Sequence, residues 1–171
     1  EYIAKYKADL NSGFQKLNIN KLYQAILFFC ENGMLKTKLN KLLFYADFTN
    51  FNYYTVSITG ARYLHYQHGP VPEKYQSHLA ILQEEEFITI EETPIIDYIG
   101  EMIISLRKPD LTIFSELEKN TLMEVMRYFK DFNATDIRKF SHDEKGYLET
   151  QDREFISYAY ADNLQNIRKG S

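Results

Sequence analysis

Three histidines give the chain its strongest resemblance to a metal or catalytic cluster. His65 and His68 are separated by two residues, and His78 follows ten residues later. The segment around His65 alternates like a strand, so His65 and His68 are expected on opposite faces. No second cluster of Cys or His completes a set of four ligands, as a structural zinc site would need. The pattern therefore favours hydrogen-bonding or surface histidines over a metal site, and neither a metal nor a cofactor is expected.

Cys30 is the one residue with the chemistry of a strong nucleophile. It lies within an apolar segment of helical spacing, next to Phe29, where cysteine usually serves as a small buried hydrophobe. The sequence also contains no glycine-rich phosphate loop and no Gly-x-Ser-x-Gly motif. These features favour a binding protein over an enzyme, with a hydrolase as the least favoured alternative.

Asp47 interrupts the aromatic run Leu43-Phe-Tyr-Ala-Asp-Phe48. Burying a carboxylate is costly unless it is paired, and Arg62 is the nearest suitable partner along the chain. Two interpretations remain open at this stage. Asp47 either forms a structural ion pair with Arg62 or faces water on the outer side of its helix.

Two groups of charged residues could attract a partner. The acidic residues Glu84 to Glu86, with Glu91 and Glu92, are typical of a solvated face but could also steer a basic partner. Lysines at positions 36, 38 and 41 could contact phosphate or could lie on a solvated helix face. The net charge of -4 is evidence against nucleic acid as the principal ligand.

The elements that position these residues can be read from hydrophobic spacing. The 171 residues are 44% hydrophobic and 15% aromatic, which predicts one folded domain. Helices are predicted at 21–32 and 38–52, the second capped by Thr37. A strand at 62–66, a helix from Pro72 to about Glu86 and a hairpin of 88–92 with 101–107 follow. This order predicts a mainly helical α+β fold with a winged-helix-like core.

The segment His68-Gly-Pro-Val-Pro72 is predicted to be a rigid corner between the strand and the next helix. Gly69 permits unusual backbone angles, while Pro70 and Pro72 stiffen the chain. The C-terminal third is predicted to be helical, and Ser115 to Glu118 matches a capping box. Residues 1–19 are expected to be a linker or the end of an upstream module, residues 20–165 one domain and residues 166–171 a tail.

Two motifs resemble a known family. The first is Lys36-Thr-Lys-Leu-Asn-Lys-Leu-Leu-Phe-Tyr-Ala-Asp-Phe48, followed by Ser57-Ile-Thr-Gly60, Arg62-Tyr63 and His68-Gly-Pro-Val-Pro72. The second is Ser141-His-Asp-Glu-Lys-Gly-Tyr147, where family members usually carry Trp at the position of Tyr147. Together they resemble the Panacea domain, also called the SocA-like or phage-associated GepA-like domain, over roughly residues 20–160.

The resemblance implies a bacterial or prophage antitoxin that binds and neutralises a cognate toxin. It also implies that a protease, or operator DNA bound through a preceding module, could take part. The alternative from the element order is a DNA-binding regulator. With no signal peptide or long apolar span, the expectation is a cytoplasmic protein without membrane contact. The candidate partner-binding residues are Tyr63, Tyr66, His68, Tyr75 and Tyr147, and the candidate structural residues are Asp47, Gly60, Arg62, Gly69, Pro70, Pro72 and His142.

Overall fold

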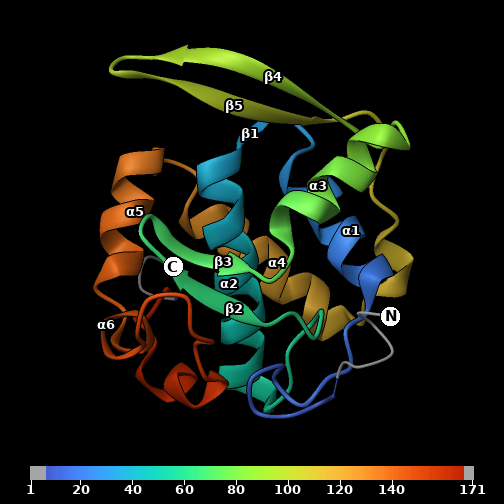
Figure 1. Cartoon of the computed structure of the whole chain (residues 1–171). Coiled ribbons are helices and arrows are strands. Elements are labelled where there is room, and N and C mark those ends of the chain that lie inside the picture. The colour runs from blue at the N-terminus through green and yellow to red at the C-terminus, as the bar shows by residue number, and fades with distance from the viewer. Residues whose placement is uncertain (1–6, 168–171) are drawn as a thin grey trace.

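The computed structural model describes residues 7–167 of the chain. Helices and short strands alternate in its first two thirds, and the last third is helical (Figure 1). The α+β class predicted from the sequence is confirmed. In chain order the elements are α1 (Ile19–Phe29), β1 (Met34–Leu35), α2 (Lys36–Tyr54), β2 (Tyr63–Tyr66), β3 (Gly69–Pro72), α3 (Tyr75–Glu84), β4 (Ile88–Ile95), β5 (Tyr98–Ser105), η2 (Leu111–Ile113), α4 (Glu116–Tyr128), α5 (Ala134–His142), α6 (Lys145–Glu149) and η3 (Tyr158–Asn163).

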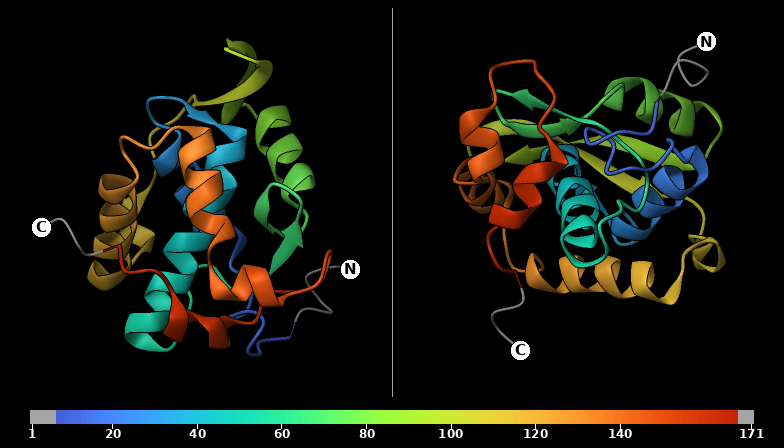
Figure 2. Two further views of the ribbon diagram at one scale, coloured as in Figure 1. Left: turned by 90° about the vertical axis from the view of Figure 1, so that its left-hand side faces the viewer. Right: turned by 90° about the horizontal axis from the view of Figure 1, so that it is seen from below.

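Helix α2 is the centre of the fold. Viewed along its axis, it is surrounded by α1, α4, α5 and the β2–β3 hairpin (Figure 2). Every residue from 38 to 50 is buried, polar ones included. A helix that is covered on all sides must satisfy each of its polar groups internally. The hydrogen bonds of these polar residues therefore determine how the surrounding elements are held.

The strands form two separate antiparallel sheets. One contains three strands in the order β1-β5-β4, and the other is the β2–β3 hairpin. Strands β4 and β5 pair from Ile88 with Ser105 to Ile95 with Tyr98, and β1 contacts β5 only at Met102 and Ile103. This long hairpin, termed the wing (residues 88–105), crosses the top of the molecule, and its tip lies above α5 (Figure 1).

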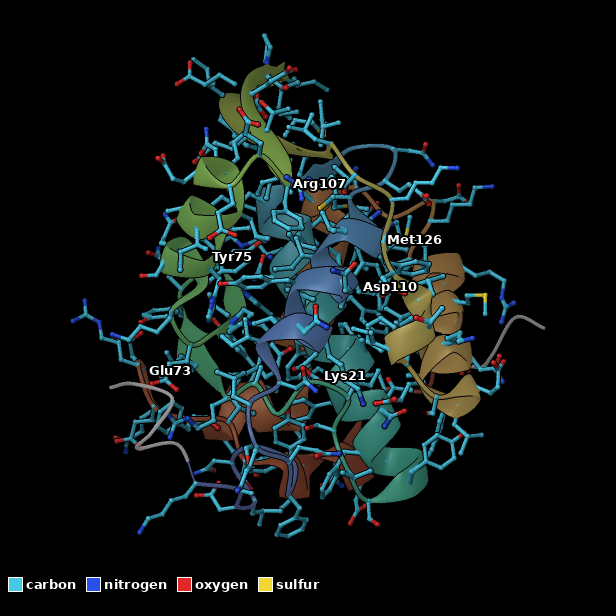
Figure 3. The ribbon with its side chains drawn as sticks, turned by 90° about the vertical axis from the view of Figure 1, so that its right-hand side faces the viewer. Lys21, Glu73, Tyr75, Arg107, Asp110 and Met126 are labelled. Carbon is cyan, nitrogen blue, oxygen red and sulfur yellow. The ribbon has the colours of Figure 1, made fainter. Side chains whose placement is uncertain are left out.

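The base of the wing is fixed to the body by polar and aromatic contacts. The guanidinium of Arg107 lies 3.9 Å from the ring centre of Phe87, below the wing (Figure 3). The Ser105 hydroxyl donates a hydrogen bond to the carbonyl of Leu27 in α1. On the other side of α1, Lys21 pairs with Glu118 of α4 at 2.8 Å. The Arg107 and Ser105 contacts orient the wing relative to α1, and the Lys21–Glu118 pair joins α1 to α4.

Two local predictions are wrong. Residues 69–72 form strand β3 and close a hairpin with β2 through the two-residue turn Gln67–His68, so Pro72 pairs with Tyr63 and does not begin a helix. Proline is compatible with this position because β3 is an edge strand. Helix α2 begins at Lys36, one residue before the predicted cap Thr37, and its N-cap residue Leu35 makes no side-chain hydrogen bond.

The capping box at Ser115 and Glu118 is confirmed, with both reciprocal hydrogen bonds present. A turn at residues 9–14 packs against the loop that follows α2. In it Ser12 is fully buried, and its carbonyl accepts a hydrogen bond from the Ser57 hydroxyl at 2.7 Å. Residues 1–6 and 168–171, parts of the predicted linker and tail, lie outside the described residues.

Candidate partner-binding site

Asp47 is a buried structural residue, but its partner is not Arg62. Its carboxylate accepts hydrogen bonds from the backbone amides of Ile58 and Thr59, both at 2.9 Å, and from the hydroxyls of Thr59 and Tyr63 at 2.6 and 2.7 Å. Burial raises the pKa of the carboxyl group, and these four donors oppose that shift. Both earlier interpretations, the Arg62 pair and the solvent-facing carboxylate, are therefore wrong.

Arg62 instead pairs with Glu73 at 2.6 Å and also lies over the ring of Phe155. It thus connects the β2–β3 hairpin to the C-terminal segment. Gly60, in the loop that binds Asp47, has a φ of +76°, and a Cβ there would lie 2.3 Å from the carbonyl oxygen of Lys16. Only glycine allows the two backbone segments to approach this closely.

Three of the five candidate partner-binding residues are buried and have structural roles. Tyr63 is fully buried against Asp47, and the Tyr75 hydroxyl donates to the carbonyl of Lys36 at 2.8 Å. Tyr147 is buried, and its hydroxyl donates to the carbonyl of Tyr66 at 2.7 Å. The amphipathic character of tyrosine suits such a buried hydrogen bond as well as an interface, so the partner-binding role of these three tyrosines stays a prediction.

Tyr147 lies between two imidazole rings. Its ring is stacked on His65 at a centroid distance of 3.8 Å and on His142 at 4.6 Å, both nearly parallel. Nδ1 of His65 lies 2.8 Å from the carbonyl oxygen of Tyr147, so this nitrogen donates. Burial, followed by the charges of Arg138 and Lys41, lowers the pKa of His142. The stack therefore ties β2, α5 and α6 together.

The other residues considered for metal binding or catalysis include Cys30 and His78. Within residues 7–167, no group of three His, Cys, Asp or Glu side chains could hold a metal ion. Cys30 is fully buried, and burial raises the pKa of its thiol, which keeps it in the unreactive protonated form. His78 is buried, with Nδ1 3.1 Å from the Tyr23 hydroxyl. These contacts are structural.

A groove lies between the wing, the first turns of α2, the β2–β3 turn and α5. It consists of two adjoining cavities of about 670 and 330 Å³ that share Thr37, Lys41 and His68. The larger cavity is also lined by Tyr66 and Tyr75, and the smaller by Tyr98 of the wing and Arg138 of α5. The exposed candidates Tyr66 and His68 are therefore both in this feature, termed the wing groove.

The carbonyl of Pro70 accepts a hydrogen bond from the Asn40 side chain of α2 at 2.7 Å. Gly69, with a φ of +126°, leaves room for the side chain of Lys41, whose Cε would lie 2.8 Å from a Cβ at that position. These contacts hold the Gly69-Pro70-Val71-Pro72 segment against α2. Val71 of this segment lines the larger cavity of the wing groove.

The three lysines at the start of α2 do not form a phosphate-binding or solvated face. Lys36 pairs with Glu101 of the wing at 3.3 Å. Lys38 is buried and donates to the carbonyls of Phe129 and Phe132 at 2.7 and 2.6 Å. Lys41 is also buried and donates to the carbonyl of Thr37, one turn earlier. The sequence pattern missed this because burial of α2 depends on elements far away along the chain.

Lys41 should give the stability of the protein a characteristic pH dependence. Burial and the nearby Arg138 charge lower the pKa of Lys41 from 10.5 to about 8. Between these values the unfolded chain binds more protons than the folded one, so stability rises with pH. We expect the free energy of unfolding, relative to that of Lys41→Met, to rise by roughly 2 kcal/mol between pH about 8 and about 10.

Urea unfolding at a series of pH values would measure this difference. The lowered pKa of His142 keeps that ring neutral over this range, so it contributes no slope. The tyrosines whose pKa is raised by burial, such as Tyr45, act in the opposite direction above pH about 10, but they are present in both proteins. Parallel curves for the wild type and Lys41→Met would contradict the prediction.

The tip of the wing carries exposed aliphatic side chains. Ile96 is 99% exposed and Ile99 is 69% exposed, and Tyr98 beside them is 44% exposed. The acidic residues Glu91 and Glu92 are exposed further along the wing. The tip could not be identified from the predicted hairpin, in which Ile96 and Ile99 belong to the connection between the strands. The signal in the sequence is the apolar run around Asp97, Ile96 before it and Tyr98 and Ile99 after it, at a turn where polar residues are usual.

The family model described as "Antitoxin SocA-like, Panacea domain" matches residues 39–147. This span includes most of α2, the β2–β3 hairpin, the wing, α5 and Tyr147 at its end. The chain therefore belongs to the SocA-like Panacea antitoxin family. No curated protein and no solved structure matches it. Among the described residues, no helix is both long and apolar enough to span a membrane.

Proposed function

We propose that the chain is an antitoxin-type interaction domain that binds and neutralises a cognate toxin, with the wing and the wing groove as its binding surface. The observation that carries this proposal is the exposed apolar tip of the wing beside a groove with aromatic walls. Apolar side chains exposed together, with polar neighbours, are typical of protein-binding sites. Family membership supplies the class of partner.

The rigid base and the exposed tip of the wing suit binding without chemistry. Ile96 and Ile99 can enter a pocket of the partner, while the groove accepts a segment of it. A few such apolar and aromatic anchors commonly supply most of the binding energy of an interface. Lys38 is buried with its ammonium bonded to two carbonyls, and Lys36 pairs with Glu101. These lysines therefore give no specific support to the alternative of a DNA-binding regulator.

Co-expression with the product of the adjacent reading frame tests the proposal. We expect a co-purifying complex and rescue of growth, because neutralisation requires binding. The variant carrying Ile96→Asp and Ile99→Asp should weaken the complex roughly 100-fold, measured by calorimetry, because both apolar anchors become charged. The melting temperature should not change, since both side chains are exposed.

Leu117→Asp is the matched control, because Leu117 is an exposed apolar residue on α4, on the other side of α2 from the β2–β3 hairpin (Figure 2). It should leave both affinity and growth rescue unchanged. Absence of a complex and of growth rescue with the wild-type chain would overturn the proposed function. A normal affinity of the wing-tip variant would remove the wing from the binding surface.

A further inference from the structure

The inner end of the wing groove contains a buried positive charge without a carboxylate partner among the described residues. Lys41 is 1% exposed, and its ammonium donates one hydrogen bond, to the carbonyl of Thr37. An ammonium group has three donors, so two remain available. By contrast, the ammonium of Lys38, one turn earlier on α2, donates hydrogen bonds to two carbonyl oxygens. Burying a charge with so little compensation is costly unless a ligand completes the site.

Two further cationic or titratable groups lie at the same place on different elements. Arg138 of α5 and His68 of the β2–β3 turn line the smaller cavity together with Lys41. The Arg138 charge acts on Lys41, which it helps to shift toward the neutral form. Arg138 is exposed and can swing over the cavity. Gly69 leaves the space through which the Lys41 side chain reaches this position.

The surroundings favour a single carboxylate over a polyanion. Glu101 and Asp152 line the adjoining cavity, where Lys36 and Arg153 pair with them at 3.3 and 3.7 Å, and Glu91 and Glu92 are exposed on the wing. An extended phosphate backbone would have to pass these carboxylates, whereas a single acidic group needs only the space beside Lys41 and Arg138. Tyr98 supplies an aromatic wall on the wing side of the smaller cavity. Arginine and lysine bind carboxylates through charge-assisted hydrogen bonds, which are stronger than neutral ones.

We propose that the inner end of the wing groove binds a carboxylate side chain of the partner protein, with Lys41 and Arg138 as its donors and His68 at its rim. The identity of the ligand as part of the toxin rests on the proposed function. Binding of the carboxylate itself does not, and can be measured with the chain alone. The partner's carboxylate supplies the negative charge that no described residue provides beside Lys41.

The test uses two acetylated, amidated tripeptides, Leu-Glu-Leu and Leu-Gln-Leu, titrated into the ¹⁵N-labelled protein and followed by NMR. We expect the Glu peptide to shift the amide signals of residues around the groove and to bind at least about ten-fold more tightly than the Gln peptide. Lys41→Met and Arg138→Gln should each abolish this preference. Arg127→Gln, an exposed arginine on α4, is the control and should retain it.

Lys41→Met should also raise the melting temperature in the absence of peptide, by about 3 °C or more, since an uncompensated buried charge is removed. A lysine with a purely structural role would instead lower it on replacement. Equal binding of the Glu and Gln peptides, or an unchanged preference in both Lys41→Met and Arg138→Gln, overturns the proposal. Tighter binding of a single-stranded oligonucleotide than of the Glu peptide overturns the choice of ligand.

The two proposals fail in different ways. If the Glu peptide binds through Lys41 and Arg138 but no toxin complex forms, the carboxylate site stands and the proposed function is lost. If the complex forms and Arg138→Gln and Lys41→Met leave its affinity unchanged, the function stands and the carboxylate site is lost as part of the interface. In a complex that uses the site, each variant should weaken binding about ten-fold.

Discussion

Replacement of Asp47 by alanine is expected to lower the free energy of unfolding by about 3 to 5 kcal/mol. The carboxylate accepts four hydrogen bonds from donors that have little access to water, among them the Tyr63 hydroxyl and the amides of Ile58 and Thr59. Its removal leaves these donors unsatisfied and opens a cavity at the contact of α2 with the following loop. The melting temperature should fall by roughly 10 °C.

Denaturant unfolding followed by circular dichroism measures the effect. Asp97→Ala, at the exposed turn of the wing, is the matched control and should change stability by less than about 0.5 kcal/mol. Asp47→Asn should lie between the wild type and Asp47→Ala, because it keeps one acceptor oxygen but places an amide donor opposite other donors. An Asp47→Ala protein as stable as the Asp97→Ala protein would show that the loop does not depend on this carboxylate.

Replacement of Tyr147 by alanine should cost about 3 to 5 kcal/mol, the usual range for a buried aromatic side chain. The ring fills the space between His65 and His142, and its hydroxyl binds the carbonyl of Tyr66 at the end of β2. The β2–β3 turn should lose its support from α6, so affinity for a groove ligand should fall together with stability. Calorimetric unfolding and the peptide titration measure the two effects.

Two substitutions separate the ring from the hydroxyl. Tyr147→Phe keeps the stack and removes only the hydrogen bond to Tyr66, so it should cost about 1 kcal/mol. Tyr147→Trp introduces the residue common in the family and should retain stacking on both imidazoles. If Tyr147→Phe were as damaging as Tyr147→Ala, the hydroxyl and not the stack would hold the turn in place.

The helices and the wing could be predicted from the sequence because their signals are local. Leu22, Ala25, Ile26 and Phe29 repeat at helical spacing, and all are buried in α1. The capping box of α4 depends on residues three apart. The wing was predicted from alternation at 88–92 and 101–107. In the structure both strands continue toward the turn between them, β4 as far as Ile95 and β5 from Tyr98, and β5 ends at Ser105.

The predictions that were wrong concern interactions between distant parts of the chain. The pairing of β3 with β2 could not be read from a segment rich in proline, because an edge strand tolerates residues that lack an amide donor. The burial of Lys38 and Lys41 depends on α4, α5 and β3, which cover a helix whose sequence looks half polar. Lysine spacing alone predicts a solvated face.

The choice of partner for Asp47 illustrates the same limit within the candidate site. Sequence proximity and charge favoured Arg62, but the loop at residues 57–60 places three donors around the carboxylate and Tyr63 supplies a fourth. Arg62 pairs with Glu73 instead. Which of two feasible partners a buried carboxylate takes depends on the path of the backbone. The groove was missed for the same reason, because four elements distant in sequence form it.

The attachment of the wing at one end has a dynamic consequence. Strand β1 pairs with β5 at Met102 and Ile103. In the outer half of the wing, from Thr93 to Gly100, β4 and β5 pair with each other and with no third strand among the described residues. Local opening of this outer half breaks few contacts with the core, so its amide protons should exchange with solvent before those of α2. Binding of a partner at the tip would then appear as slowed exchange confined to this half, which makes the wing an intrinsic reporter of complex formation.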